Sequence, residues 1–433
     1  MPDKAWVISV NMGYGHQRTS FPLRDLAPDN EIINANDYAG IPEGDRRLWE
    51  TTRKGYEFIS NFKRIPVLGD FVFSIFDRFQ RIFSFYSERN FQKPNSQLKQ
   101  TFSFIRGGWG RHLIGELAAK NKERGEVLPL ISSFFTPAFM AEYWGYPGDI
   151  YCIVCDADIS RTWAPLRPKQ SKIKYFAPTE RVTERLALYG VKPENIFLTG
   201  YPLPKELLGK TDLVNLKEDL RHRLLNLDPQ KKYFQKYKVL VENKLGKLPT
   251  VSGHPLTLLF SVGGAGAQKE LALEIVKSLK DRIKKGEVQI ILSAGTKAVV
   301  QEYFEKNLKK ISADKFLGSG VEILFGQSIQ DYFQKFDNAL RRTDILWTKP
   351  SELSFYAVLG LPIIIAPTIG SQEEFNKRWL LKSGFGLSQE NPALSEQWLF
   401  DWLDQGFLAE AAMQGFIEGE KSATLKIKEI IKK

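Results

Sequence analysis

The stretch WTKPSELSFYAVLGLPIIIAPTIGSQEEFN, residues 347–376, indicates the class of fold more clearly than any other part of the chain. Its centre, Ile363–Ala366, is an apolar run rich in β-branched residues, which is typical of a parallel strand buried on both faces. A short helical pattern at 352–359 precedes this strand, and the polar cluster Ser371–Asn376 follows it. Open parallel sheets bind ligands at the carboxyl ends of their strands, so we expect this cluster to face a ligand.

The composition is that of a folded protein with more than one domain. A chain of 433 residues exceeds one ordinary core, and 43% hydrophobic with 26% charged residues is usual for globular proteins. The sequence contains nothing close to the roughly 18 uninterrupted apolar residues of a membrane span. The N-terminus, MPDKAWVISV, leads into a predicted strand without a signal-peptide pattern. We therefore expect a cytoplasmic protein.

The two cysteines, Cys152 and Cys155, have a C-x-x-C spacing that invites comparison with redox motifs. The surrounding residues have the pattern of a strand, where side chains three positions apart point to opposite faces. Redox motifs of this spacing lie at a helix N-terminus instead. We therefore predict two buried thiols.

Positive charge is concentrated near one aromatic segment. The net charge is +11, and residues 53–124 hold 14 Lys and Arg against 6 Asp and Glu. Within 56–90, apolar residues at helical spacing form a stripe: Phe71, Val72, Ile75, Phe76, Phe79, Ile82, Phe83 and Tyr86. Aromatic and basic residues on one amphipathic helix favour contact with an anionic membrane surface. The alternative is a helix packed on the domain core.

The first predicted strand, 6–10, ends in a glycine-containing turn with Gly13, Gly15 and His16. A strand, a glycine turn and a helix start are the opening of a doubly wound domain, and free N–H groups at the helix start can face an anion. An imidazole at the strand mouth is placed for proton transfer. A helix-capping or solvent-facing histidine is the alternative.

Acidic residues follow another predicted strand. Asp156-Ala157-Asp158 comes directly after the strand at 149–155. An Asp-x-Asp can hold a divalent cation against a diphosphate, and a carboxylate that orients a partner or an acceptor hydroxyl is the alternative that we favour. The loop 106–112 is rich in Gly and could cradle a phosphate, although a flexible turn is the interpretation that we favour.

Residues 200–204, GYPLP, form a rigid connector that we take as the domain boundary. The charged segment 209–253 has helical patterns only and reads as an insertion. The second domain then repeats the opening of the first, with a strand, the turn Gly263–Ala267 and a helix, a second cradle for a diphosphate. Further strands are predicted at 128–135, 175–177, 196–199, 256–262, 288–293, 321–325 and 345–347.

These motifs resemble the GT-B glycosyltransferases, in the group that contains monogalactosyldiacylglycerol synthases, diacylglycerol glucosyltransferases and the peptidoglycan lipid N-acetylglucosaminyltransferase. The resemblance covers nearly the whole chain except 209–253. The matching motifs are, in chain order, Gly13-Tyr14-Gly15-His16, Asp156 with Trp163, Gly200-Tyr201-Pro202, Gly263-Gly264-Ala265-Gly266, and Gly360-Leu361-Pro362 followed by Gln372-Glu373-x-x-Asn376. The resemblance implies an α/β protein of two doubly wound, Rossmann-like domains facing a central cleft.

The resemblance also implies an inverting, metal-independent transfer of a sugar from a nucleotide diphosphate sugar, usually a UDP-sugar, to a lipid acceptor at the membrane surface. His16 would be the general base and Asp156 would orient the acceptor or the base. Gly13, Gly15 and Trp163 would lie on the acceptor side. No cofactor and no metal are expected, because N–H groups would stabilise the leaving diphosphate.

On the donor side, the resemblance assigns the phosphates to the glycine turn and the sugar hydroxyls to Gln372 and Glu373. The residues assigned to the donor in this way are Gly263, Gly264, Gly266, Ala267, Phe325, Ser351, Glu352, Gln372 and Glu373. One departure concerns the ribose, because the position of the usual ribose-binding Glu is Phe355 here and Glu352 lies one helical turn earlier. A second departure is Ser160-Arg161, where lipid glucosyltransferases often carry a His.

The predicted domains are 1–200 on the acceptor side, 201–393 on the donor side and 394–433 as C-terminal helices that pack back on the first domain. Alternatives within the same fold are transfer to a soluble acceptor and sugar-nucleotide epimerisation. A catalytically inactive GT-B protein that binds a ligand is a third. No motif supports a nucleic-acid partner, because the basic residues interleave with a stripe too apolar for a phosphate groove.

Overall fold

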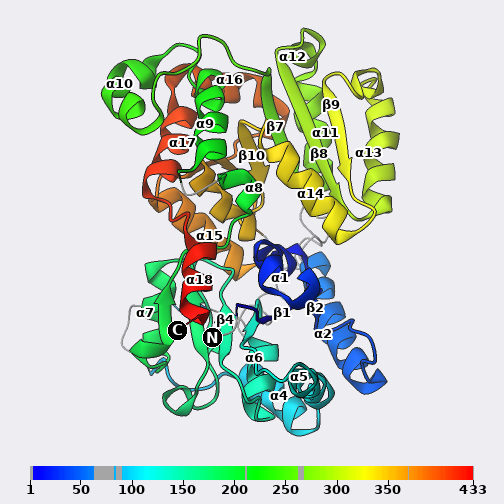
Figure 1. Cartoon of the computed structure of the whole chain (residues 1–433). Coiled ribbons are helices and arrows are strands. Elements are labelled where there is room, and N and C mark those ends of the chain that lie inside the picture. The colour runs from blue at the N-terminus through cyan, green and yellow to red at the C-terminus, as the bar shows by residue number, and fades with distance from the viewer. Residues whose placement is uncertain are drawn as a thin grey trace. The chain divides into compact units, whose positions relative to one another are not determined.

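The computed structural model describes residues 3–62, 82–83, 90–209, 212–261, 268–368 and 370–432. The chain divides into two compact units, each built around one parallel sheet (Figure 1). Unit 1 comprises Met1–Leu203, Ile369–Asn376 and Glu420–Lys433, and unit 2 comprises Pro204–Thr368 and Lys377–Gly419. Two parallel α/β sheets confirm the predicted class of fold, a pair of Rossmann-like domains.

The sheet of unit 1 has, among the described residues, six parallel strands in the order β2-β1-β3-β4-β5-β6. They are β1 (Trp6–Ser9), β2 (Ile33–Asn34), β3 (Leu130–Ser132), β4 (Ile150–Ile153), β5 (Lys174–Ala177) and β6 (Ile196–Leu198). The order reverses at β1, which lies between β2 and β3 and pairs with both in parallel. Ligands of open α/β sheets bind outside the carboxyl ends of the strands at such a switch point. The loops after β1 and β3 are therefore the expected location of a site.

Helices cover the sheet of unit 1 (Figure 1). They are α1 (Tyr14–Ser20), α2 (Glu43–Phe62), α4 (Ser96–Arg106), α5 (Arg111–Arg124), α6 (Phe135–Tyr143), α7 (Glu180–Leu188) and α18 (Ala423–Ile431). The C-terminal helix α18 contributes Ile427 and Ile431 to the core that also holds Val7 and Ile131. Lys428 of this helix pairs with Asp25, with a distance of 2.7 Å between Nζ and Oδ2. The end of the chain is therefore part of the core around the first strand.

The sheet of unit 2 has six described parallel strands in the order β12-β11-β10-β7-β8-β9. They are β7 (Leu256–Ser261), β8 (Val288–Gly295), β9 (Val321–Phe325), β10 (Ile345–Thr348), β11 (Ile363–Ile365) and β12 (Gly386–Ser388). Numbered from β7, this is the 3-2-1-4-5-6 order of dinucleotide-binding sheets, with the switch point between β7 and β10. All side chains of β11 are buried, as the apolar run predicts.

The helices of unit 2 include the predicted insertion, which is helical as expected. They are α8 (Lys205–Leu208), α9 (Val214–Leu227), α10 (Lys232–Leu245), α11 (Lys269–Ser278), α12 (Lys280–Lys284), α13 (Ala298–Lys310), α14 (Ile329–Leu340), α16 (Ser395–Gln405) and α17 (Phe407–Glu418). Arg223 anchors α9, because its buried guanidinium donates to the carbonyl oxygens of Thr343 and Leu359, each at 2.8 Å. The helix α15 (Ser371–Lys382) has its first residues in unit 1 and the rest in unit 2.

Two of the strands, β2 and β12, were not predicted. With two and three residues, they are too short to display a period in the sequence. The helix predicted at 352–359 forms as a 3-10 helix, η7 (Glu352–Leu359). In the described part of the chain, no helix combines the length and apolar character needed to span a membrane.

Two predictions concern residues outside the described ranges. The glycine turn Gly263–Ala267 is one of them. Most of the aromatic stripe within 56–90 is the other, and of its members only Ile82, which is buried, and Phe83, which is 43% exposed, are described.

Candidate active site

The turn after β1 is shaped by Gly13, whose φ of 116° lies in the region that side chains with a Cβ rarely adopt. The helix α1 begins immediately after it and carries Gly15 and His16 in its first turn. The hydroxyl of Thr19 in the same helix lies 3.1 Å from the hydroxyl of Tyr201, and this contact ties α1 to the connector predicted at 200–204. This places His16 at the switch point of unit 1.

His16 is held by the loop that follows β3. Its Nδ1 lies 2.8 Å from the carbonyl oxygen of Ser133. Because a carbonyl oxygen only accepts, Nδ1 carries the proton and the neutral ring has its lone pair on Nε2. Cys155 Sγ lies 3.5 Å from the same Nδ1. The sequence did not point to Ser133, because a backbone acceptor leaves no signature in residue type.

Aromatic rings surround His16 and set its protonation state. The rings of Phe134 and Trp163 have centroids 4.5 and 6.5 Å from the imidazole. Burial in this apolar setting lowers the pKa of His16 to about 4, while the hydrogen bond with Ser133 opposes the shift. The imidazole is therefore neutral at pH 7, which is the form that a general base requires.

Asp156 follows β4 and faces an amide side chain from a distant part of the chain. Asn376 donates from Nδ2 to Asp156 Oδ1 at 3.1 Å, and the N–H of Ala157 donates to Asn376 Oδ1 at 2.7 Å. All three residues belong to unit 1. Asn376 was part of the motif taken from the sequence, but the motif alone did not show what its side chain contacts.

The second carboxylate of Asp-x-Asp has a structural partner. Asp158 and Arg185 form a bidentate pair, with 2.8 Å from Nε to Oδ1 and 2.7 Å from Nη2 to Oδ2. Arg185 is fully buried and also donates to the carbonyl oxygen of Phe83 at 2.8 Å. Both oxygens of Asp158 therefore bind a guanidinium. Within the described ranges, His, Cys, Asp and Glu do not gather in threes where they could hold a metal ion.

Trp163 and Arg161 shape the loop after β4. Trp163 is buried and its ring packs against Phe135 with centroids 5.3 Å apart. Arg161 donates to the carbonyl oxygens of Gln92, at 3.0 Å, and Pro165, at 2.9 Å. Arg161, at the second departure from the resembled family, is therefore a cation that binds backbone carbonyl groups of its own domain.

In unit 2, hydrogen bonds join the segments that follow the strands at their carboxyl ends. Thr348, at the end of β10, donates its hydroxyl to the carbonyl oxygen of Ser261 at 3.2 Å. Gln268, directly after the glycine turn, donates to the carbonyl oxygen of Pro367 at 2.7 Å. The ends of β7, β10 and β11 are thereby joined at the switch point of this sheet.

In the region predicted to bind the ribose of the donor, Glu352 occupies an accessible position. Glu352 is half-buried in the first turn of η7, and Ser351 is the N-cap residue. Phe355, at the position of the usual ribose contact, is 2% exposed and packs against Trp379 with centroids 5.1 Å apart. Phe325 ends β9 at the same edge of the sheet and is half-buried. Of Phe355 and Glu352, only the second has a polar group to offer a ribose.

The predicted sugar contacts lie at the start of α15. Gln372 is half-buried and Glu373 is 7% exposed. Both fall in the part of the helix that belongs to unit 1, together with Asn376. The two cysteines are buried thiols that are not joined in a disulfide, which confirms the prediction of buried thiols.

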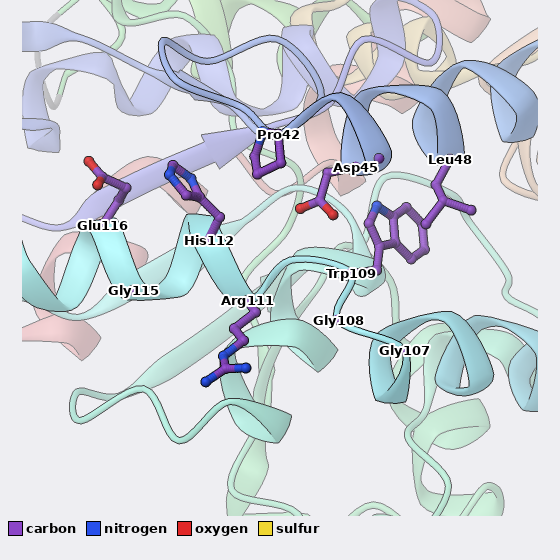
Figure 2. Close-up of a pocket in the computed structure, with 11 residues that line it drawn as sticks. Pro42, Asp45, Leu48, Gly107, Gly108, Trp109, Arg111, His112, Gly115 and Glu116 are labelled. Carbon is purple, nitrogen blue, oxygen red and sulfur yellow. The ribbon is translucent and has the colours of Figure 1, made fainter.

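A separate pocket of about 610 Å³ lies on the surface of unit 1 (Figure 2). The glycine-rich loop before α5 lines it, with Asp45 from α2 and Glu116 from α5. Asp45 accepts a hydrogen bond from the N–H of Gly110 at 3.1 Å, and burial raises the pKa of its carboxyl. Arg111 points away from Asp45 and lies over the Trp144 ring, 5.6 Å from its centroid. The two carboxylates in the lining oppose an anion, which favours a simple turn over a phosphate cradle for this loop.

Comparisons with known proteins place the chain near glycosyltransferases. It is 22% identical over 319 residues to the processive diacylglycerol beta-glucosyltransferase of Bacillus subtilis (strain 168), a match that covers 72% of this chain and 67% of the relative. The enzyme of the same name from Bacillus pumilus (strain SAFR-032) is 21% identical over 383 residues, covering 86% and 79%. Residues 249–318 match a family described as a domain of unknown function (DUF6938).

Solved structures with a similar arrangement include MurG of Acinetobacter baumannii. It has a TM-score of 0.44 and 16% identity, and the match covers 77% of each chain. A UDP-N-acetylglucosamine 2-epimerase from Listeria monocytogenes, designated putative, has a TM-score of 0.45 and 14% identity, covering 79% of this chain and 82% of the other. The named sequence relatives and the two parallel sheets together support placing this chain in the GT-B glycosyltransferase group of enzymes.

Proposed function

We propose that the chain is an inverting, metal-independent glycosyltransferase that moves a sugar from a nucleotide diphosphate sugar, a UDP-sugar in our proposal, to a lipid acceptor. The observation that carries the proposal is His16. Its Nδ1 proton is committed to Ser133, and its Nε2 lone pair is available on a ring that is neutral at pH 7.

In the proposed reaction, Nε2 of His16 takes the proton of the acceptor hydroxyl as that oxygen forms a bond to the anomeric carbon. The bond from this carbon to the diphosphate oxygen breaks, and the leaving nucleoside diphosphate takes the electron pair. Attack on the face opposite the leaving group inverts the configuration. Asp156 orients the acceptor or the imidazolium that forms, and Gly13, Gly15 and Trp163 shape the acceptor side.

For the donor, we propose that the N–H groups of the turn with Gly263, Gly264, Gly266 and Ala267 stabilise the leaving diphosphate, in place of a metal. Glu352 takes the role of the ribose contact. Gln372 and Glu373 hold sugar hydroxyls. The accessible position of Glu352 next to the buried Phe355 supports this assignment.

A screen of nucleotide sugars and acceptors, read by mass spectrometry, tests the proposal. We expect a glycolipid product, no effect of EDTA, and a large loss of turnover in His16→Ala. Transfer only to soluble acceptors would favour the first alternative, and a changed sugar configuration without transfer would favour an epimerase. Calorimetry that detects no nucleotide sugar binding would contradict the enzyme proposal, and binding without turnover would indicate an inactive relative.

The lipid acceptor implies peripheral attachment to a membrane from the cytoplasmic side. The basic surplus of 53–124 and the aromatic stripe within 56–90 support this part of the proposal. We expect co-sedimentation with vesicles that contain anionic lipid, weakening as salt screens the charges. If the protein still binds these vesicles fully after Phe76, Phe79 and Phe83 are replaced by Ser, the membrane assignment is wrong.

A further inference from the structure

Asn376 occupies a position whose chemistry the proposed reaction does not yet use. Its side chain is fully buried, although asparagine is usually exposed. It bridges the carboxylate of Asp156 and the N–H of Ala157, 220 and 219 positions earlier in the chain. Because the two partners are so far apart in the sequence, the tertiary fold forms this contact, and it is not part of a local turn or helix cap.

The two hydrogen bonds determine the orientation of the amide. The N–H of Ala157 requires an acceptor, so Oδ1 of Asn376 must face it. The Nδ2 group then necessarily donates to Asp156 Oδ1, at 3.1 Å. A donor on one carboxylate oxygen determines the rotation of the side chain.

The helix α15 carries both Asn376 and the residues predicted to contact the sugar. Gln372 and Asn376 are four residues apart in α15 and therefore lie on one side of it, one turn from each other. Both fall in the part of α15 that belongs to unit 1. The bridge from Asn376 to Asp156 therefore sets the distance between that carboxylate and the first turn of the helix that carries Gln372 and Glu373.

We infer that Asn376 is a positioning residue for glycosyl transfer, which acts by holding the Asp156 carboxylate in register with the sugar-contacting turn of α15. The inference rests on the proposed function. It assigns Asn376 no contact with substrate. Its effect should therefore appear in the chemical step more than in donor binding, because a misplaced catalytic group lowers turnover while the donor contacts remain.

Kinetics of Asn376→Ala and Asn376→Asp test the inference. We expect Asn376→Ala to lower kcat by roughly 10- to 100-fold, with the donor Kd from calorimetry within about twofold of wild type. Asn376→Asp keeps an acceptor for Ala157 but places a second carboxylate beside Asp156. Its activity should recover as pH falls from 8 to 6, because the introduced acid regains a donor proton.

Asn226→Ala is the matched control. Asn226 also donates to a buried carboxylate, Asp344, at 2.9 Å, but this pair lies at the amino end of β10, where Asp344 N donates to Thr257. We expect this variant to lose stability while keeping the kcat and the pH profile of the wild type. Amide hydrogen exchange of the peptide that contains Ala157 is a measurement independent of activity. The protection of the Ala157 N–H should fall in Asn376→Ala and persist in Asn376→Asp.

The outcomes separate the two proposals. A wild-type kcat in Asn376→Ala, or unchanged exchange at Ala157, overturns the inference and leaves the proposed function intact. The inference is also overturned if Asn376→Ala and Asn226→Ala lose kcat equally and Asn376→Asp recovers no activity at low pH. That result would show a merely structural role for Asn376. A wild-type protein that turns over no donor overturns the proposed function, and the inference with it.

Discussion

At the scale of single residues, the environment of His16 decides what its imidazole can do. The Ser133 carbonyl oxygen selects the tautomer, and the rings of Phe134 and Trp163 exclude water from one side. The sequence placed a histidine at a strand mouth, where a capping role was equally reasonable. The contact with Ser133, which lies 117 positions later, shows that Nδ1 does not cap the helix and leaves Nε2 for the base role that we propose.

The pH dependence of turnover follows from this environment. The pKa of His16 is lowered to about 4, so the base remains neutral as the pH falls from 8 to 5 and becomes protonated only below that range. We expect kcat/KM to be flat over that range and to fall with a midpoint near pH 4. Initial rates across pH, with stability checked at each point, measure this. A midpoint near 6.5 would show an ordinary, solvated imidazole.

At the scale of elements, the end of β4 is held by the buried pair of Asp158 and Arg185. Removing one partner leaves a buried charge without compensation. We expect Arg185→Met to lower the free energy of unfolding by about 3–5 kcal/mol, measured by urea denaturation. The double variant with Asp158→Asn should recover part of that loss. A loss below about 1 kcal/mol would mean that water reaches the pair.

The helix α5 offers a stabilising change beside the pocket of Figure 2. Gly115 lies inside this helix, and a Cβ there would meet no atom within 4 Å. We expect Gly115→Ala to stabilise the protein by up to about 1 kcal/mol, because alanine is the better helix former. Thermal unfolding measures this, and the kcat should not change, since the proposed reaction does not use the pocket. A lower Tm would contradict the open space found at this position.

At the scale of the whole molecule, unit 1 is assembled from three segments of the chain. The helix α18 buries Ile427 and Ile431 in the core around β1. We expect a chain that ends at Gly419 to unfold unit 1 at a lower temperature, because that core loses its covering helix. Calorimetry should show the transition of unit 2 unchanged. Identical transitions with and without 420–433 would show that α18 adds nothing to unit 1.

The sequence by itself determined the elements and their chemistry. Buried parallel strands show as apolar runs, and the helical insertion shows as a 3.6-residue period, because both patterns are local. The stretch 347–376 thus predicted η7 and β11, whereas the helix α15 at its end was described only as a polar cluster. The sequence also identified the histidine and the acidic residues at strand ends, because their positions directly after a strand are a local pattern. The short strands β2 and β12 were missed because two or three residues hold no period.

Only the tertiary structure decided which of these groups meet. The order of strands locates the two switch points, and no local pattern encodes an order of strands. Asn376 contacts Asp156, Arg185 pairs with Asp158, and Arg161 donates to the carbonyl oxygen of Gln92, and each contact joins residues distant in sequence. The polar cluster that ends the stretch 347–376 was expected to face a ligand. Tertiary contacts show that one of its members, Asn376, bridges the Asp156 carboxylate and the N–H of Ala157 within unit 1, because a buried amide must satisfy its donor and its acceptor inside the fold.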